Sequence, residues 1–200
     1  MNEIEGFILA GGSSSRMGRD KAQLRIAEQT FSERIAAELL GFTDRVTMIG
    51  GAKVPENLSA AKDVFNGIGA LGGLHGALSA CKADWALVVA CDLPFVTSEL
   101  FEKLAATRSD SEAVVPVQQD GRPQPLCALY RKSPCLEVAT SLIEVGKRRP
   151  LDLLDRVKTR WIPFAELKPL NHATEFFVNI NTPEDYDEAT RKHSATPNLT

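Results

Sequence analysis

The chain has 200 residues, of which 44% are hydrophobic and 24% are charged, and its formal net charge is −3. This length and composition predict one large, soluble globular domain, and the weakly negative charge argues against general binding of nucleic acid. No run approaches the roughly 20 apolar residues of a membrane span, and residues 1–6 carry two glutamates where a signal peptide would be basic.

The four cysteines, Cys81, Cys91, Cys127 and Cys135, are scattered, without a CxxC pair and without histidine at metal-binding spacing. Free thiols of this kind behave as small apolar residues and persist in a reducing compartment. The sequence therefore predicts a cytoplasmic protein without disulfides.

The first predicted strand, over residues 6–10, leads into a run of two glycines and three serines at 11–15. Small residues let the backbone approach a ligand and leave N–H groups free to point in one direction. Concentrated positive charge follows, in Arg16, Arg19, Lys21 and Arg25. The stretch therefore predicts a binding site for a polyphosphate. It is neither a Walker A loop nor a GxGxxG fingerprint, and the alternative is a plain strand-to-helix connection with solvated cations.

Apolar periodicity and turn residues define the remaining elements. Helices are predicted over residues 30–40, 71–81, 97–106, 133–146 and 151–154, and a last helix begins at 182 with a capping-box pattern. Strands are predicted over residues 45–49, 58–62, 85–90, 113–117, 126–130 and 160–163, with a further short apolar run at 176–179. The tail, residues 193–200, has no periodicity and is expected to be disordered.

Strands that alternate with helices imply right-handed βαβ units and a mostly parallel sheet with helices on both faces. Ligands of such sheets bind beyond the carboxyl ends of the strands. Asp63, Asp92 and Asn179 each come at the end of a predicted strand or apolar run, as does the loop from Gly11 to Lys21. We therefore expect these polar residues to share one edge of the sheet.

Asp92 follows the most apolar strand and precedes a Leu-Pro pair. Magnesium commonly takes one or two protein carboxylates together with substrate phosphates, so a single aspartate that faces a phosphate loop is sufficient. The alternative is an aspartate that caps the helix near Pro94. We predict that Asp92 is a magnesium ligand.

Several segments resemble the MobA family of nucleotidyltransferases, the molybdenum cofactor guanylyltransferases. Residues 9–24 (LAGGSSSRMGRDKAQL) resemble the family signature, and residues 90–96 (ACDLPFV) resemble its magnesium-binding segment. Residues 69–74 (GALGGL) resemble the start of a family helix, with Ala70 in place of the usual proline, and residues 178–185 (VNINTPED) resemble its closing segment. The resemblance implies a Rossmann-like three-layer α/β nucleotidyltransferase fold over residues 1–192, with a mostly parallel central sheet and helices on both faces.

The resemblance also implies roles for individual residues. The residues that match nucleotide-binding positions are Leu9, Ala10, Gly11, Gly12, Lys21, Asp63 and Asp92. The residues that match catalytic positions are Arg16, Lys21 and Asp92, of which Asp92 also matches the metal ligand. Asn179 and Asn181 match amides near the metal and the pterin substrate. Where some members place an asparagine after the second strand, this chain has Ile49, Gly50 and Gly51.

The second substrate of the family, molybdopterin, carries a phosphate and a planar ring. The basic residues 147–149, with Arg148 at their centre, and the polar loop 120–125 are the remaining features able to receive it. The alternative for the basic residues is a favourable position after a helix C-terminus, where cations oppose the dipole. Trp161 is expected in the core rather than against the pterin.

The predicted activity is the transfer of GMP from GTP to molybdopterin, with Mg²⁺ as cofactor and release of pyrophosphate. This reaction needs no protein nucleophile, which agrees with the absence of a Ser/His/Asp or Cys/His arrangement. The alternatives are a CTP-dependent enzyme acting on the same cofactor or on a sugar phosphate, and a non-catalytic nucleotide-binding adaptor in cofactor delivery. Gly12 favours GTP, because guanylyl-transferring relatives resemble LAGG at this point and cytidylyl-transferring ones LAAG. Expected partners are a molybdenum insertase and molybdoenzyme chaperones, without nucleic acid or membrane.

Overall fold

The computed structural model describes residues 3–10, 21–51, 54–62, 65, 67–180 and 182–194. The strands in these ranges are β1 (Ile4–Leu9), β2 (Arg25–Ile26), β3 (Gln29–Thr30), β4 (Val46–Ile49), β5 (Ser59–Ala61), β6 (Trp85–Ala90), β7 (Ala113–Pro116), β8 (Cys127–Arg131) and β9 (Thr159–Ile162). The helices are α1 (Phe31–Phe42), α2 (Ala70–Ala80), α3 (Ser98–Ala106), α4 (Lys132–Glu144), α5 (Pro150–Leu154), α6 (Phe164–Leu167) and α7 (Pro183–Ser194), with a 3-10 helix at Lys21–Gln23.

The central sheet has the strand order β5-β4-β1-β6-β8-β7-β9, and β2 pairs with β3 in a separate hairpin. β5, β4, β1 and β6 are parallel, β8 is antiparallel to both of its neighbours, and β7 is parallel to β9. The predicted mostly parallel sheet is therefore confirmed. Because β8 reverses direction, a loop at the carboxyl edge joins β7 to β8 in place of a crossover helix.

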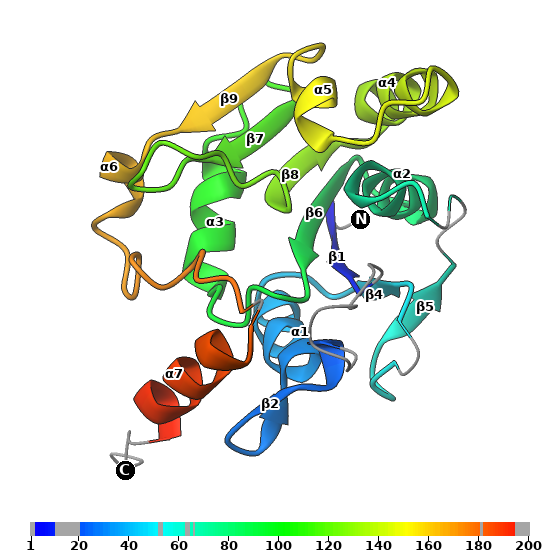
Figure 1. Ribbon diagram of the computed structural model, residues 1–200. Coiled ribbons are helices and arrows are strands. Elements are labelled where there is room, and N and C mark those ends of the chain that lie inside the picture. Colours follow the sequence, from blue (N-terminus) through cyan, green and yellow to red (C-terminus); the bar gives the residue numbers. More distant parts are fainter. Residues whose placement is uncertain are drawn as a thin grey trace.

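Helices cover both faces of the sheet (Figure 1). Successive side chains of β6 point alternately into the two cores. Leu87 and Val89 pack with α1 and α3, and Ala86 and Val88 pack with α2, α4 and α5. This two-sided burial explains why residues 85–90 form an unbroken apolar run, in which all six side chains are buried. The sequence predicted the bounds of β6 correctly.

Two helices begin with a capping box, and the sequence predicted the one at residue 182. The hydroxyl of Thr30 accepts a hydrogen bond from the N–H of Glu33, whose carboxylate accepts one from the N–H of Thr30, so α1 begins with a complete capping box. Thr182 and Asp185 exchange the same pair of bonds at the start of α7. α7 extends through Ser194, two residues beyond the predicted limit of the domain, and residues 195–200 lie outside the described part.

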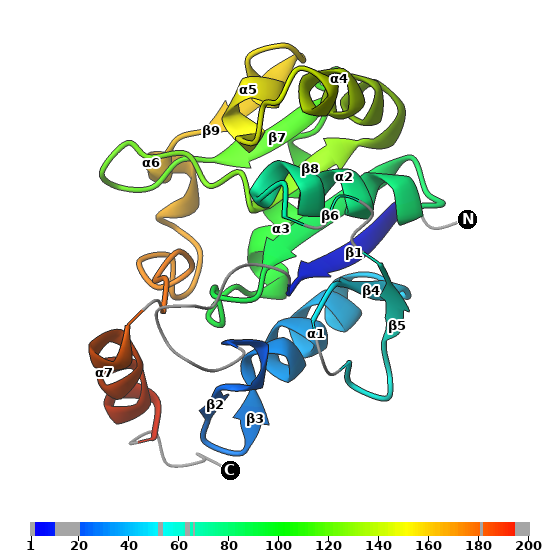
Figure 2. The same ribbon diagram turned by 45° about the vertical axis from the view of Figure 1, so that its right-hand side comes forward.

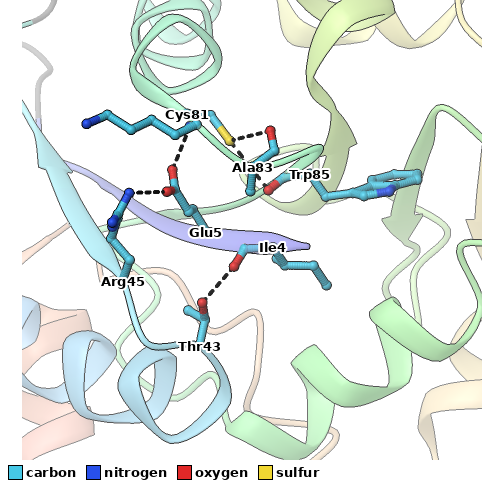
Figure 3. A network of polar contacts seen from close by, with 8 residues as sticks. Ile4, Glu5, Thr43, Arg45, Cys81, Ala83 and Trp85 are labelled. Carbon is cyan, nitrogen blue, oxygen red and sulfur yellow. Dashed lines mark hydrogen bonds and ion pairs between the residues drawn. The ribbon is translucent and has the colours of Figure 1, made fainter. Parts of the chain in front are cut away.

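The amino edge of the sheet is held by a polar network around Glu5 (Figure 3). The buried Glu5 carboxylate binds the Arg45 guanidinium at 2.8 Å and accepts the backbone N–H of Lys82 at 2.8 Å. The Thr43 hydroxyl donates to the carbonyl of Ile4 at 2.7 Å. These bonds connect the segments at which β1, β4 and β6 begin. The buried carboxylate of Glu5 is paired with a guanidinium and accepts a backbone N–H, so its charge is compensated.

Two sequence predictions are wrong at the surface. Trp161, expected in the core, lies on the edge strand β9 and is 37% exposed. The run 176–179 forms turns and irregular backbone, although its two aromatic side chains are buried. Phe176 and Phe177 bury their rings in the same cluster, 6.0 Å apart, whereas consecutive residues of a strand would point to opposite faces. In the described residues, no helix is long and apolar enough to cross a membrane.

Candidate functional site

The carboxyl ends of β1, β4 and β6 are joined by backbone hydrogen bonds at the edge of the sheet. The N–H of Ala10 donates to the carbonyl of Ile49 at 3.0 Å, and the N–H of Cys91 donates to the carbonyl of Leu9 at 3.0 Å. Asp92 therefore lies one residue away from the point where β6 meets the end of β1. The structure thus brings together Leu9, Ala10 and Asp92, as expected for consecutive parallel strands.

Asp92 is half-buried in the turn that follows β6. Leu93, which follows it, is buried, and the N–H of Leu93 returns to the carbonyl of Ala90 at 3.2 Å, which closes the turn. The carbonyl of Asp92 accepts the N–H of Ile180 at 3.2 Å. Among the described residues there is no group of three or more carboxylate, histidine or cysteine side chains that could hold a metal ion.

Much of the predicted phosphate loop lies outside the described residues. Gly11, Gly12 and Arg16 belong to this part, and Lys21 is described only in its backbone, where the 3-10 helix begins. The structure describes the residues on both sides of the loop. Ala10 precedes it, and beyond it the carbonyl of Ala22 accepts the hydroxyl of Ser32 at 2.9 Å, which anchors the exit of the loop against α1.

Asp63 and Asn181 also lie outside the described residues. Asn179 does not follow a strand, so the reason for expecting it at this edge was wrong. It nevertheless reaches the predicted edge, because the neighbouring Ile180 binds the carbonyl of Asp92. Its side chain is exposed and lines a cavity of about 160 Å³ with Phe95, Glu175 and α7.

Glycines keep the end of β4 close to β1. Gly51 has φ +83°, and a Cβ at this position would lie 3.0 Å from the Cβ of Ala10 and 3.0 Å from the Cε of Met48. The asparagine that some relatives of the predicted family carry here is thus replaced by backbone alone. A side chain at Gly51 would be both strained and crowded against Ala10.

The basic residues 147–149 lie between the end of α4 and the start of α2. The N–H of Lys147 donates to the carbonyl of Leu142 at 2.9 Å, which closes α4, and the carbonyl of Arg148 accepts the N–H of Leu71 at 3.2 Å. α2 joins two parallel strands, β5 and β6, so its first turn lies at the carboxyl edge of the sheet. Arg148 is therefore at the same edge as Asp92. The three side chains are exposed and form no ion pair within the described ranges.

A larger cavity, of about 450 Å³, lies at the same edge beyond β7. One wall is the β7–β8 loop with Gln118, Gln119 and Asp120, and the other wall comes from the segment between β9 and α7, with Phe164, Ala173, Thr174, Phe177 and Val178. Arg122 binds the Asp120 carboxylate at 2.6 Å and lowers the pKa of Asp120 by this hydrogen bond. The cavity offers aromatic rings opposite amide groups, which suits a planar polar ligand.

Neither the far wall of this cavity nor the β2–β3 hairpin was predicted from the sequence. The hairpin turns at Ala27 and Glu28, where Ala27 has φ +52°. A turn of this kind normally carries glycine or asparagine, and without them the hairpin has no recognisable signal. Apart from Phe164 at the start of α6, the residues of this wall come from turns and irregular backbone, which bury aromatic rings without a periodic pattern.

Residues 6–158 match the family of MobA-like NTP transferase domains. A "Probable molybdenum cofactor guanylyltransferase" of Clostridium perfringens is 35% identical over 191 residues, which cover 92% of this chain and 95% of the relative. One of the same name from Halalkalibacterium halodurans is 34% identical over 203 residues, with 95% and 100% covered. Among solved structures, the "Molybdopterin-guanine dinucleotide biosynthesis protein A" of Archaeoglobus fulgidus has a TM-score of 0.80 at 24% identity, with 96% and 100% covered, which shows a shared fold.

Proposed function

The chain belongs to the family of MobA-like NTP transferase domains, and on this basis we propose that it transfers GMP from GTP to molybdopterin with release of pyrophosphate. The observation that supports this most directly is the hydrogen bond between Cys91 and Leu9. It sets the carboxylate-bearing turn of Asp92 beside the strand that leads into the glycine-rich loop. A metal-binding carboxylate next to a phosphate loop is what transfer at an α-phosphate requires.

The reaction is an in-line displacement. An oxygen of the acceptor phosphate attacks the α-phosphorus of GTP, and the new P–O bond forms as the bond to the β-phosphate oxygen breaks. The electron pair of that bond leaves with pyrophosphate. We assign Arg16 and Lys21 to the charge of the leaving phosphates, and the backbone around Leu9, Ala10, Gly11 and Gly12 to the nucleoside. Because the protein supplies no nucleophile, positioning and charge neutralisation carry the catalysis.

Asp92 would hold the magnesium ion. Mg²⁺ neutralises phosphate charge and orients the reacting oxygens when it is bound. Asp92 suits this ion because it is half-buried and adjacent to the β1 end, and one carboxylate suffices when phosphates complete the coordination. We assign Asp63 to the nucleotide by its match to the family pattern.

We assign the acceptor to the part of the edge beyond β6. The 450 Å³ cavity beside the β7–β8 loop has room for a pterin ring between amide and aromatic side chains. β7 lies two strands from β6, a separation of about 10 Å. Asn179 and Asn181 would contact the acceptor between the cavity and the metal, and Arg148 would bind its phosphate. All four cysteines are free thiols, which supports our assignment to the reducing cytoplasm.

The test is pyrophosphate release with Mg²⁺ and molybdopterin, comparing GTP, CTP, ATP and UTP. Release with GTP alone is the expected result. Release with CTP alone would keep the fold and the site but assign a cytidylyltransferase, and would show that Gly12 does not select the base. Saturable binding without release of pyrophosphate from any nucleotide would contradict the proposal and indicate another acceptor or a non-catalytic adaptor.

A further inference from the structure

A small apolar cluster lies outside the two cores that flank the sheet. It consists of six buried side chains, with Tyr186 packed against them: Leu24, Ile26, Phe31, Phe95, Ile180 and Ala189. We call it the satellite cluster. α7 and the β2–β3 hairpin lie side by side in both views of the molecule (Figures 1 and 2). Both contribute to the cluster, with Ile26 from β2 and Ala189 from α7.

The satellite cluster receives one side chain from each segment of the candidate site. Leu24 follows the phosphate loop three residues after Lys21, Phe95 comes three residues after Asp92, and Ile180 is the residue next to Asn179. These three side chains are 8%, 7% and 0% exposed. The segment that follows the loop, the turn after Asp92 and the segment of Asn179 therefore pack together in one cluster.

Two hydrogen bonds connect the segments that contribute side chains to the satellite cluster. The hydroxyl of Tyr186 donates to the carbonyl of Arg25 at 2.6 Å, and its ring lies 6.3 Å from the ring of Phe31. The N–H of Ile180 donates to the carbonyl of Asp92 at 3.2 Å. The first bond attaches α7 to the exit of the phosphate loop, and the second attaches the segment before α7 to the metal-binding turn.

We propose that the satellite cluster sets the position of Asp92 relative to the phosphate loop, and that Tyr186 is a positioning residue that acts through it. This inference rests on the proposed function for its effect on turnover. Most described side chains of α7 are exposed, so the helix depends on this cluster for its docking. Small units of this kind open locally more readily than a central core. When α7 moves away, the loop exit and the Asp92 turn lose their shared contact.

Hydrogen exchange followed by mass spectrometry tests the inference without substrate. Tyr186→Phe removes the hydroxyl and keeps the ring. We expect faster exchange in peptides covering residues 21–31 and also in those covering 91–98, although the second segment does not touch the hydroxyl. Tyr130→Phe is the matched control. The Tyr130 hydroxyl donates to the carbonyl of Pro125 at the same 2.6 Å, but Tyr130 lies in the core formed with α2, α4 and α5. This control should leave exchange in both peptides unchanged.

Steady-state kinetics supply the second measurement. With one hydrogen bond lost, kcat of Tyr186→Phe should fall about threefold to tenfold, while KM for GTP changes less, because we assign the nucleoside to the end of β1 and the residues that follow it. Ile180→Val removes one methyl group from the acceptor side of the cluster. It should likewise speed exchange in both peptides and lower kcat. It serves as the second variant if Tyr186→Phe does not fold.

Faster exchange confined to α7 and residues 21–31, with 91–98 unchanged in both variants, would overturn the inference. A kcat of Tyr186→Phe equal to that of the wild type would also overturn it. If the wild-type protein transfers no nucleotide, the proposed function fails, and the exchange experiment still decides whether the cluster couples the two segments.

Discussion

Asp92 and Asp84 are the two aspartates that flank β6, one beyond its carboxyl end and one before its amino end. Asp92→Ala should reduce magnesium-dependent pyrophosphate release at least about a hundredfold. Without the carboxylate, no bound metal ion would neutralise the charge of the reacting phosphates. Asp84→Ala, at the opposite edge, should retain the wild-type rate. Melting curves of both variants should stay close to the wild type. A normal rate in Asp92→Ala would contradict the metal assignment.

Gly51 is the residue at which backbone conformation and close packing coincide. Gly51→Ala should place a methyl group 3.0 Å from the Cβ of Ala10 and displace the strand end that we assign to the nucleoside. We expect Kd for GTP, measured by calorimetry, to rise about tenfold. In the double variant with Ala10→Gly, the contact with the Cβ of Ala10 is gone while the contact with the Cε of Met48 remains, so part of the affinity should return.

Gly146→Ala controls for backbone strain in this experiment. Gly146 has φ +76°, but nothing lies within 4 Å of the place a methyl group would occupy, so the substitution costs about 1 kcal/mol of strain without crowding. It should lower the melting temperature and leave Kd for GTP unchanged. A Kd for GTP that stays at the wild-type value in Gly51→Ala, as in Gly146→Ala, would show that crowding against Ala10 does not affect nucleotide binding.

At the scale of elements, the reversed strand β8 gives the carboxyl edge its two parts. The parallel strands β4, β1 and β6 end together at the point where β1 leads into residue 11, whereas β7 and β8 are joined by the loop that lines the 450 Å³ cavity. α4 and α2 meet at the same edge through the hydrogen bond between Leu71 and Arg148. The basic residues 147–149 are thus placed by helix packing and not by a strand.

Arg148→Ala should raise KM for molybdopterin about tenfold and leave KM for GTP nearly unchanged, because the guanidinium would bind the acceptor phosphate. The dependence of KM for molybdopterin on salt should also become weaker. Arg156→Ala is the control, since Arg156 is likewise exposed and without an ion pair among the described residues, but lies just before β9 at the amino edge. A rise in KM for GTP alone would assign Arg148 to the donor instead.

At the scale of the whole molecule, the two cores bury three of the four thiols. Burial raises the pKa of Cys81 to about 11 and those of Cys127 and Cys135 to about 12, from an ordinary value of 9.0. The unfolded chain releases these protons near pH 9, whereas the folded chain retains them. Stability that is fully present below pH 9 is therefore lost as the pH rises towards 11 to 12, by about 1.4 kcal/mol per thiol and pH unit.

Urea denaturation at pH 8 and at pH 10 measures this loss. The double variant Cys127→Ala/Cys135→Ala should be less stable at pH 8, because small cavities replace the sulfur atoms. Its stability should nevertheless fall less between the two pH values than that of the wild type. Identical losses in both proteins would show that buried thiols do not control alkaline unfolding. Tyr130, whose pKa burial also raises, adds a further loss above pH 10 in both proteins.

Local patterns predicted much of this fold. β6 is predicted correctly because a strand buried on both faces must be apolar throughout, and α1 because its buried residues Phe31, Ile35 and Leu39 recur every four positions. The strand at 176–179 fails because apolar content alone does not distinguish a strand from a turn that buries two rings in one cluster. The hairpin around Ala27 fails because its turn lacks the residues that normally mark one.

Short-range periodicity and turn chemistry were sufficient to predict the strands of the central sheet, most of its helices and its mostly parallel arrangement. Three features emerge only in the folded chain: β8 runs antiparallel, Arg148 reaches the start of α2, and Leu24, Phe95 and Ile180 share one cluster. Contacts between segments so far apart in the chain depend on packing in three dimensions, and no local sequence pattern predicts them.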